Sequence, residues 1–395
     1  MTSSIHPFAG YVVAAPWASR VVGPAYDALT GAERRALADA DPLSFFNVVR
    51  STADHPGASA EELLAANASA LEHLLRAGVY TPTPPALHLY RLTAGDRRQI
   101  GVVAEVDVEE YRRGRIRAHE ATIRAKEDAL LEHLSRVRVS SSPVCLTYRA
   151  RPDIDELVGR LSRREADLTF STSDGLVQDV WTIADPADQQ ALAASFARLS
   201  AAYITDGHHR AAAAARLAAR HPGETGDARL LVVLFPHDQL HVYGFHRIVR
   251  DLGGRTPAEI LAAVEKGFTI EALDASAAPG ARGRFTLVLG GRAYALTARP
   301  PLDEPDAAIA QHRLLEPALG VHDPRDDPRL EFAPGVLPPG DAAARAAGGL
   351  CLTLHPVAVE EMMEAADRAA PLPPKSTYFD PKARSGVFVR LRPPT

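Results

Sequence analysis

The sequence has few cysteines and no long hydrophobic run, and these absences exclude several classes of protein. Only two of its 395 residues are cysteines, Cys145 and Cys351, and each lies in an apolar, strand-like stretch. With no CxxC pair and no cysteine–histidine zinc spacing, we interpret them as buried thiols in a reducing compartment. No apolar stretch approaches the roughly 18 residues of a membrane span, and the N-terminus lacks the basic and apolar regions of a secretion signal. We therefore expect a cytoplasmic protein with no membrane partner.

An excess of positive charge is also missing. The chain has 44 lysines and arginines against 49 acidic residues, for a formal net charge of -5. Its densest basic stretch, residues 111–117, is short, whereas nucleic-acid-binding domains usually carry a larger basic surface. The composition therefore argues against a nucleic-acid partner. The sequence contains no Gly-x-Ser-x-Gly elbow, no HExxH and no GxGxxG, so serine hydrolase, zincin and Rossmann interpretations have no support.

Length and composition indicate a folded chain with more than one domain. Hydrophobic residues make up 46% and charged residues 24%, which is the globular average, and 395 residues exceed one ordinary core. Predicted strands and helices alternate, but hairpins around residues 94–96 and 290–291 interrupt the alternation. This pattern predicts an α+β, or mixed α/β, fold. The expected parts, with approximate boundaries, are residues 1–150, 151–255 and 256–395.

Several helices are predicted by local patterns. Thr30 and Glu33 have the spacing of a capping box that opens a helix through about Ala38. Leucines at helical spacing predict a helix over about 59–77, and an alanine run predicts another over 211–219. A polar stretch from about 119 to 137 is also expected to be helical.

The strongest chemical signal is a polar turn between an expected strand and the alanine-rich helix, Asp206-Gly207-His208-His209-Arg210. The glycine permits a tight turn, and the N–H groups and positive dipole end of the helix attract an anion. Arg210 can bind phosphate with two hydrogen bonds. Asp206 can cap the helix or hold Mg²⁺, and the imidazoles can donate to phosphate oxygens. The alternative is structural, with Asp206 as the N-cap and the histidines as exposed helix residues.

A second signal is the segment His119-Glu120-Ala121-Thr122, which precedes Lys126. If the segment is helical, Thr122 and Lys126 lie four residues apart on one face. Glu120 can then act as a general base or metal ligand, and Lys126 as a phosphate contact. The alternative is a solvated, charged helix.

Two further segments are candidates. Lys375, Ser376 and Thr377 lie in a proline-bounded loop that can close over an anion, although the glycines of a P-loop are missing upstream. The alternative for this loop is a docked C-terminal segment. Tyr26 and Asp27 follow a Gly-Pro turn that either places a carboxylate near the site or serves only as turn chemistry.

Read together, these motifs resemble a large bacterial and archaeal family, catalogued as domain of unknown function 1015. Small departures are Gly-Pro-Ala-Tyr-Asp where the family usually has Ala-Pro-Pro-Tyr-Asp, and Leu372 in place of a common methionine. The resemblance spans nearly the whole chain. Its pieces are Tyr26-Asp27, Phe46 to Arg50, His119 to Thr122, Glu127-Asp128, Ser142 to Tyr148, Asp206 to Arg210 and Pro373 to Lys382.

A more distant resemblance concerns the polar turn alone. Asp-Gly-His-His-Arg before an alanine-rich helix is similar to the nucleotide-phosphate turn of ParB/sulfiredoxin-like proteins, which include free-serine kinases, CTP-dependent ParB switches and sulfiredoxin. The resemblance implies a ParB/sulfiredoxin-like nucleotide-binding core with additional α/β segments. It rests on a short motif and is an analogy.

From these resemblances we expect a kinase that transfers a phosphoryl group from ATP or ADP to a small polar metabolite, with Mg²⁺ as cofactor. Free L-serine, giving O-phosphoserine, is the leading acceptor. A second copy of the chain, forming a homodimer, is a possible partner. One alternative is a nucleotide-binding regulatory switch without turnover. Another is a metal-dependent phosphohydrolase with His119, His208 and His209 as ligands. Sulfiredoxin chemistry needs a reactive cysteine, which neither buried thiol provides.

The kinase interpretation gives each candidate residue a role. The expected catalytic residues are Glu120, Asp27 and His209, and the expected metal ligands are Asp206 and Glu120. The expected substrate contacts are His119, Thr122 and Tyr26. The expected nucleotide and phosphate contacts are Asp206, Gly207, His208, His209, Arg210, Lys375, Ser376 and Thr377.

Overall fold

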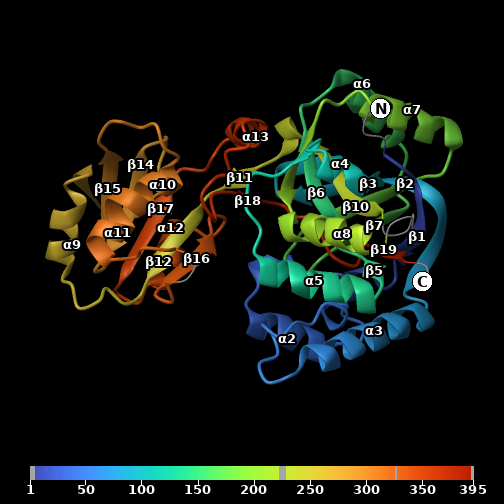
Figure 1. Ribbon diagram of the computed structural model, residues 1–395, viewed down its shortest axis with the longest axis horizontal. Coiled ribbons are helices and arrows are strands. Elements are labelled where there is room, and N and C mark those ends of the chain that lie inside the picture. Colours follow the sequence, from blue (N-terminus) through green and yellow to red (C-terminus); the bar gives the residue numbers. More distant parts are fainter. Residues whose placement is uncertain (1–4, 222–227, 325–326, 393–395) are drawn as a thin grey trace. The chain divides into compact units, whose positions relative to one another are not determined.

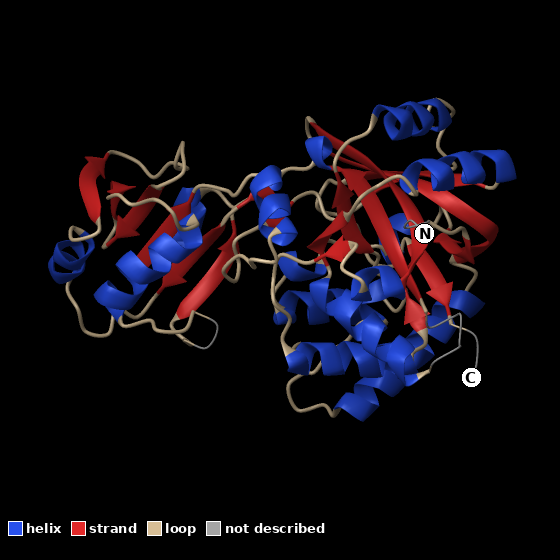
Figure 2. Cartoon of the chain, turned by 45° about the horizontal axis from the view of Figure 1, so that its top comes forward, coloured by secondary structure: helices blue, strands red, loops and turns tan. Residues whose placement is uncertain are grey.

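The computed structural model describes residues 5–221, 228–324 and 327–392, and the chain divides into two compact units. Unit 1 comprises residues 1–240 and 381–395, and unit 2 comprises residues 241–380 (Figure 1). Both units combine strands with helices (Figure 2), so the chain has the mixed α/β class expected from its sequence. In the described residues no helix is long and apolar enough to cross a membrane.

An eleven-stranded sheet forms the framework of unit 1. Strands β2 (Tyr80–Ala94) and β3 (Arg97–Asp107) form a long hairpin, which confirms the turn signal in the sequence. On the other side of β3 lies β10 (Arg229–Pro236), which runs parallel to β6 (Val144–Tyr148). Next to β6 lies β9 (Ala202–Asp206), the strand that leads into the polar turn. The expected segments 1–150 and 151–255 therefore share one sheet.

The C-terminal segment completes this sheet. Strand β1 (Phe8–Val13) pairs antiparallel with β2 on one side and with β19 (Phe388–Leu391) on the other. The chain thus returns to unit 1 after unit 2, and β19 joins the sheet of unit 1. The remaining strands of this sheet are β4 (Ile116–Arg117), β5 (Val139–Ser140), β7 (Leu168–Ser171) and β8 (Val177–Ile183).

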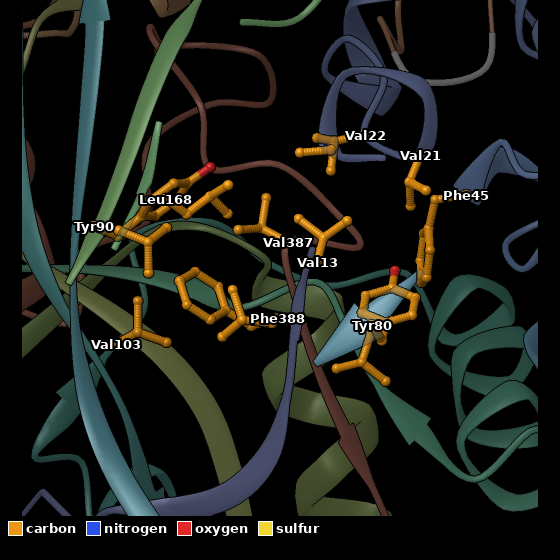
Figure 3. Close-up of a cluster of buried hydrophobic side chains, with 14 of the residues drawn as sticks. Val13, Val21, Val22, Phe45, Tyr80, Tyr90, Val103, Leu168, Val387 and Phe388 are labelled. Atoms are coloured by element: carbon orange, nitrogen blue, oxygen red, sulfur yellow. The ribbon is translucent and has the colours of Figure 1, made fainter. Parts of the chain in front are cut away.

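Side chains bury both faces of the sheet of unit 1. Successive residues of β10 alternate between two hydrophobic clusters, with Leu231 and Val233 in one and Val232 and Leu234 in the other, as the strand period of two requires. Figure 3 shows the first cluster, in which Phe388 of the C-terminal strand packs with residues of the N-terminal half. The first and last parts of the chain therefore share a core.

Two capping boxes confirm helices that the sequence predicted. Thr30 and Glu33 open α2 (Gly31–Ala40), and Ser59 opens α3 (Ala60–Arg76) in the same way. Helix α5 (Arg124–Arg136) lies beside α8 (His208–Arg220) (Figure 1). The other helices and 3-10 turns of unit 1 are α1 (Ala18–Val21), η1 (Tyr26–Ala28), η2 (Phe45–Asn47), α4 (Val108–Arg112), α6 (Pro152–Leu161), α7 (Pro186–Phe196) and η3 (His237–Gln239).

The helix expected from about 119 to 137 begins only at Arg124, so the prediction for its first turn was wrong. Tertiary contacts hold the preceding residues as a loop. The Ile123 N–H donates to Nε2 of His209 at 3.0 Å, and His119 is buried. Thr122 therefore lies outside the helix and does not share a helical face with Lys126.

Unit 2 is built on a six-stranded antiparallel sheet, in the order β13-β15-β14-β17-β12-β16. The hairpin expected around 290–291 is present, and α10, a π-helical turn and α11 follow one another along the chain. The strands are β11 (Val242–Tyr243), β12 (Phe245–Val249), β13 (Phe268–Leu273), β14 (Arg284–Leu289), β15 (Arg292–Ala298), β16 (Leu330–Pro334), β17 (Leu350–Leu354) and β18 (Tyr378–Phe379). The helices are α9 (Pro257–Val264), α10 (Asp306–Ala310), η4 (Gln311–Leu315), α11 (Glu316–Leu319), α12 (Pro339–Ala344) and α13 (Val359–Asp367).

Candidate functional site

The polar turn connects β9 to α8, at the strand-to-helix junction that the sequence predicted. Gly207 is the N-cap of α8, with a φ of 98° in the left-handed region that favours glycine. Asp206 belongs to the strand, so the alternative in which Asp206 caps the helix is wrong. Gly207 has no side chain with which to cap α8, and the first N–H groups of a helix have no partner within the helix, so they suit an anion.

Asp206 lies between two protein cations. The Lys382 ammonium donates to Oδ1 of Asp206 at 3.0 Å, and the Arg210 guanidinium donates to Oδ2. Burial raises the pKa of Asp206, but the charges of Lys382 and Arg210 outweigh burial and hold this pKa below its ordinary value. Asp206 is therefore a carboxylate at physiological pH, neutralised by its neighbours.

Lys382 also reaches a second carboxylate, because its ammonium donates to Oδ2 of Asp27 in η1. The side chain of Lys382 is 10% exposed and that of Asp206 is 28% exposed, whereas that of Asp27 is 44% exposed. Asp27 is thus the carboxylate of this group that a substrate reaches most easily. Sequence reasoning assigned no role to Lys382, although this residue ends the motif that begins at Pro373.

Arg210 braces the turn against the start of β6. Its Nη1 donates to the carbonyl oxygens of Ser142 at 2.8 Å and Pro143 at 2.6 Å. The hydroxyl of Ser142 lies 2.6 Å from that of Ser385, close in sequence to Lys382. Three segments of the family motif, far apart in sequence, therefore meet at the turn. Phosphate binding by Arg210 stays a prediction.

His208 and His119 are neutral, buried imidazoles. Their rings lie edge to face with centroids 4.6 Å apart. Burial lowers the pKa of His208 to about 3, assisted by His119, and burial lowers the pKa of His119 to about 4. Nε2 of His208 is buried and has no hydrogen-bond partner within the described residues. The two rings therefore add polar atoms to the site without adding charge at neutral pH.

His209 faces the loop before α5. Its Nε2 accepts the Ile123 N–H, so the ring proton lies on Nδ1. In the same loop Glu120 is half-buried, and the hydroxyl of Thr122 donates to Glu127 at 2.6 Å. Thr122 thus holds this loop against the first turn of α5. The catalytic roles of Glu120 and His209 and the substrate role of Thr122 stay predictions.

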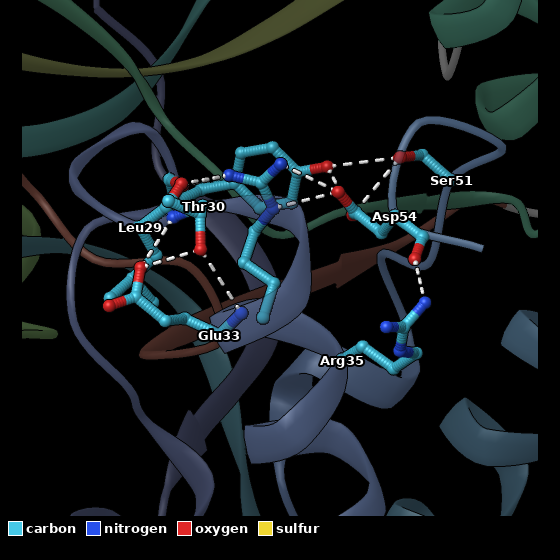
Figure 4. A network of polar contacts seen from close by, with 8 residues as sticks. Leu29, Thr30, Glu33, Arg35, Ser51 and Asp54 are labelled. Atoms are coloured by element: carbon cyan, nitrogen blue, oxygen red, sulfur yellow. Dashed lines mark hydrogen bonds and ion pairs between the residues drawn. The ribbon is translucent and has the colours of Figure 1, made fainter. Parts of the chain in front are cut away.

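Tyr26 belongs to a polar network beside the cluster. Its hydroxyl donates to Asp54 at 2.7 Å, and the Arg34 guanidinium both donates to Asp54 and lies 4.1 Å from the Tyr26 ring centroid. Figure 4 shows Asp54 of this network beside the Ser51 hydroxyl, which donates to it at 3.0 Å. Ser51 completes the network, 3.2 Å from the Tyr26 hydroxyl. This arrangement fixes η1 and directs the neighbouring Asp27 toward Lys382. A substrate contact by Tyr26 stays a prediction.

The C-terminal loop divides between the two units. Lys375, Ser376 and Thr377 belong to unit 2, where the Lys375 ammonium lies 4.9 Å from the Phe245 ring centroid. The hydroxyl of Ser376 donates to the carbonyl of Pro373 at 2.7 Å. The structure describes these residues within unit 2, and phosphate binding by the three stays a prediction.

The arrangement does not fit a metal ion held by Asp206. Mg²⁺ requires oxygen ligands in near-octahedral geometry, and both oxygens of Asp206 already accept hydrogen bonds from cations. Across the described ranges no group of three histidine, cysteine, aspartate or glutamate side chains is placed to hold a metal. The three-histidine site of the hydrolase alternative is therefore not formed.

The fold and the site define a mixed α/β protein whose polar residues gather around a glycine-capped helix N-terminus. The model of the family described as "Protein of unknown function (DUF1015)" matches residues 5–319. The chain belongs to this family, as the motifs of the sequence indicated.

Solved structures similar to this chain include a free serine kinase in complex with AMP, with 14% identity over 70% of this chain and 86% of that chain and a TM-score of 0.38. A mutant free serine kinase in complex with ADP has 14% identity, covers 70% and 87%, and has a TM-score of 0.38. SbnI with a C-terminal truncation, from Staphylococcus aureus, has 12% identity, covers 72% and 85%, and has a TM-score of 0.39. The comparison with curated proteins gave no match.

Proposed function

We propose that this protein is a nucleotide-dependent kinase that transfers a phosphoryl group from ATP or ADP to the hydroxyl of a small polar metabolite. One observation carries the proposal. Lys382 ties the exposed carboxylate of Asp27 to Asp206, the residue before the glycine-capped N-terminus of α8. The Asp27 carboxylate can bind an acceptor hydroxyl, and the N-terminus of α8 can bind phosphate. The side chain of Lys382 links the two groups.

The start of α8 supports the phosphate end of this reaction. Gly207 has no β-carbon, so phosphate oxygens can approach the first N–H groups, where the helix dipole stabilises negative charge. His209 carries its ring proton on Nδ1 and can donate it to a phosphate oxygen. Phosphoryl transfer asks little covalent chemistry of a protein and depends on positioning and electrostatics, which these groups supply.

Asp27 supports the acceptor end. The acceptor hydroxyl oxygen forms a bond to the terminal phosphorus, and the bond from that phosphorus to the leaving nucleotide oxygen breaks. The hydroxyl proton passes to the Asp27 carboxylate, so ATP leaves as ADP, or ADP as AMP. Glu120 is the second candidate base. Free L-serine is the first acceptor to test, because the Asp206–Arg210 turn resembles that of free-serine kinases.

The experiment is ³¹P NMR of the purified protein with L-serine and the Mg²⁺ complex of ATP or ADP. We expect a phosphoserine signal in the wild type that Asp27→Asn abolishes. Asp96→Asn, a change of an exposed aspartate in the β2–β3 turn, is the matched control and should retain the signal. An intact nucleotide that raises the melting temperature would favour a regulatory switch, and a nucleotide without any effect would refute both interpretations.

A further inference from the structure

Lys382 places an ammonium where two carboxylates meet. Lysine side chains are rarely buried unless they are paired, and this one is 10% exposed and contacts both Asp27 and Asp206. We propose that Lys382 is a positioning residue that takes the place of a protein-bound divalent cation between these two carboxylates. Its part in phosphoryl transfer rests on the proposed function, whereas its effect on cation binding does not.

The charges of the cluster support this assignment. The carboxylates of Asp27 and Asp206 are balanced by the ammonium of Lys382 and the guanidinium of Arg210. A divalent cation would add two positive charges to a group that has no net charge, and it would have to displace a hydrogen-bonded cation from Asp206. Mg²⁺ also gives up its water reluctantly. The nucleotide-free protein should therefore bind no divalent cation here.

The segment that carries Lys382 is anchored on both sides. Before it, the carbonyl of Pro381 accepts a hydrogen bond from Gln99 at 3.2 Å. After it, the buried guanidinium of Arg384 pairs with Asp174 at 2.5 Å. These contacts hold the lysine backbone in place, which is the support that a preorganised functional group needs. The ammonium is thus positioned by the fold and is not a freely moving surface charge.

One oxygen of Asp27 stays available to a substrate. Lys382 donates its hydrogen bond to Oδ2, and the side chain of Asp27 is 44% exposed. The ammonium therefore orients the carboxylate and leaves Oδ1 for an acceptor hydroxyl. In this arrangement Lys382 sets the position of the proposed base relative to the phosphate-binding turn.

The test measures Mn²⁺ binding to the nucleotide-free protein by electron paramagnetic resonance, in which bound Mn²⁺ loses the signal of the free ion. We expect no binding at this site by the wild type and a gain of about one Mn²⁺ per chain in Lys382→Met, whose two carboxylates lose their shared cation. The gain should disappear in the double variant Lys382→Met, Asp206→Asn. Lys382→Arg, which keeps a cation, and Lys266→Met, a change at an exposed lysine, should behave like the wild type.

Two results would overturn the proposal. One is Mn²⁺ binding by the wild type that Asp206→Asn removes, a measurement that needs no change at Lys382. The other is a Lys382→Met variant that melts cooperatively, as folded proteins do, and yet gains no Mn²⁺. Neither readout depends on turnover, so a protein that makes no phosphoserine would refute the proposed kinase activity and leave this result intact.

Discussion

The ammonium of Lys382 lies 3.0 Å from Oδ1 of Asp206, although 176 residues separate them in the sequence. This contact joins the segment that returns from unit 2 to the turn at the start of α8. The polar turn therefore receives the ammonium of Lys382 from the segment that precedes the C-terminal strand β19.

Asp206→Asn should destabilise the protein. The change leaves Lys382 and Arg210 without the carboxylate that both contact, and an uncompensated cation in a largely buried position is costly. We expect a loss of about 2–3 kcal/mol, less than for a fully buried pair, because Asp206 is 28% exposed. Urea denaturation measures the loss, with Asp96→Asn as the control. A loss no larger than that of the control would show that the cluster does not stabilise the fold.

Acidification should destabilise the fold through the buried histidines. The ordinary histidine pKa is 6.5, whereas burial lowers the pKa of His208 to about 3 and that of His119 to about 4. At a pH below 6.5 and above the lowered pKa of each ring, that histidine is protonated in the unfolded chain and neutral in the folded chain. The stability contributed by the neutral rings is thus complete above pH 6.5 and is lost as the pH falls toward 4, by about 2 kcal/mol for His208 between pH 7 and 5.

The measurement is the free energy of unfolding in urea at pH 7 and pH 5. We expect His208→Phe to reduce the difference between the two values, because its ring takes up no proton in either state. His73→Phe changes an exposed histidine and serves as the control. An undiminished pH dependence in the His208 variant would contradict a buried neutral ring at this position.

Gly207→Ala should weaken both the fold and nucleotide binding. The φ of 98° disfavours any β-carbon, and an added Cβ would lie 2.9 Å from Nε of Arg210. The variant Gly78→Ala separates the backbone effect from the contact with Arg210. Gly78 also has a positive φ, of 67°, but an added Cβ there meets nothing within 4 Å. We expect Gly78→Ala to cost about 1 kcal/mol from the backbone alone, and Gly207→Ala to cost more. Isothermal titration with ATP should show weaker binding only in Gly207→Ala, and equal binding by both variants would contradict an anion site at this turn.

The polar turn and the capped helices were predictable because their determinants are local. Gly207 and the alanines after it define a turn and a helix within a few residues, and Thr30 and Glu33 form a capping box by spacing alone. The start of α5 was not predictable, because a hydrogen bond from Ile123 to His209, 86 residues away, decides it. Lys382 was missed for the same reason, since both of its carboxylate partners are distant in sequence.

The role of Tyr26 can be separated from that of Asp27 by one pair of variants. Tyr26 donates its hydroxyl to Asp54, which keeps the Arg34 guanidinium and the Ser51 hydroxyl as partners when that donor is removed. Tyr26→Phe should therefore cost about 1 kcal/mol of stability, the net value of one hydrogen bond, and leave kcat and the KM for the acceptor nearly unchanged. Asp27→Asn should leave stability nearly unchanged and lower kcat by about 10²–10⁴-fold, the usual effect of losing a general base. A Tyr26→Phe variant that raises the KM for the acceptor while unfolding like the wild type would instead show that the Tyr26 hydroxyl contacts the substrate, as the sequence-based interpretation proposed.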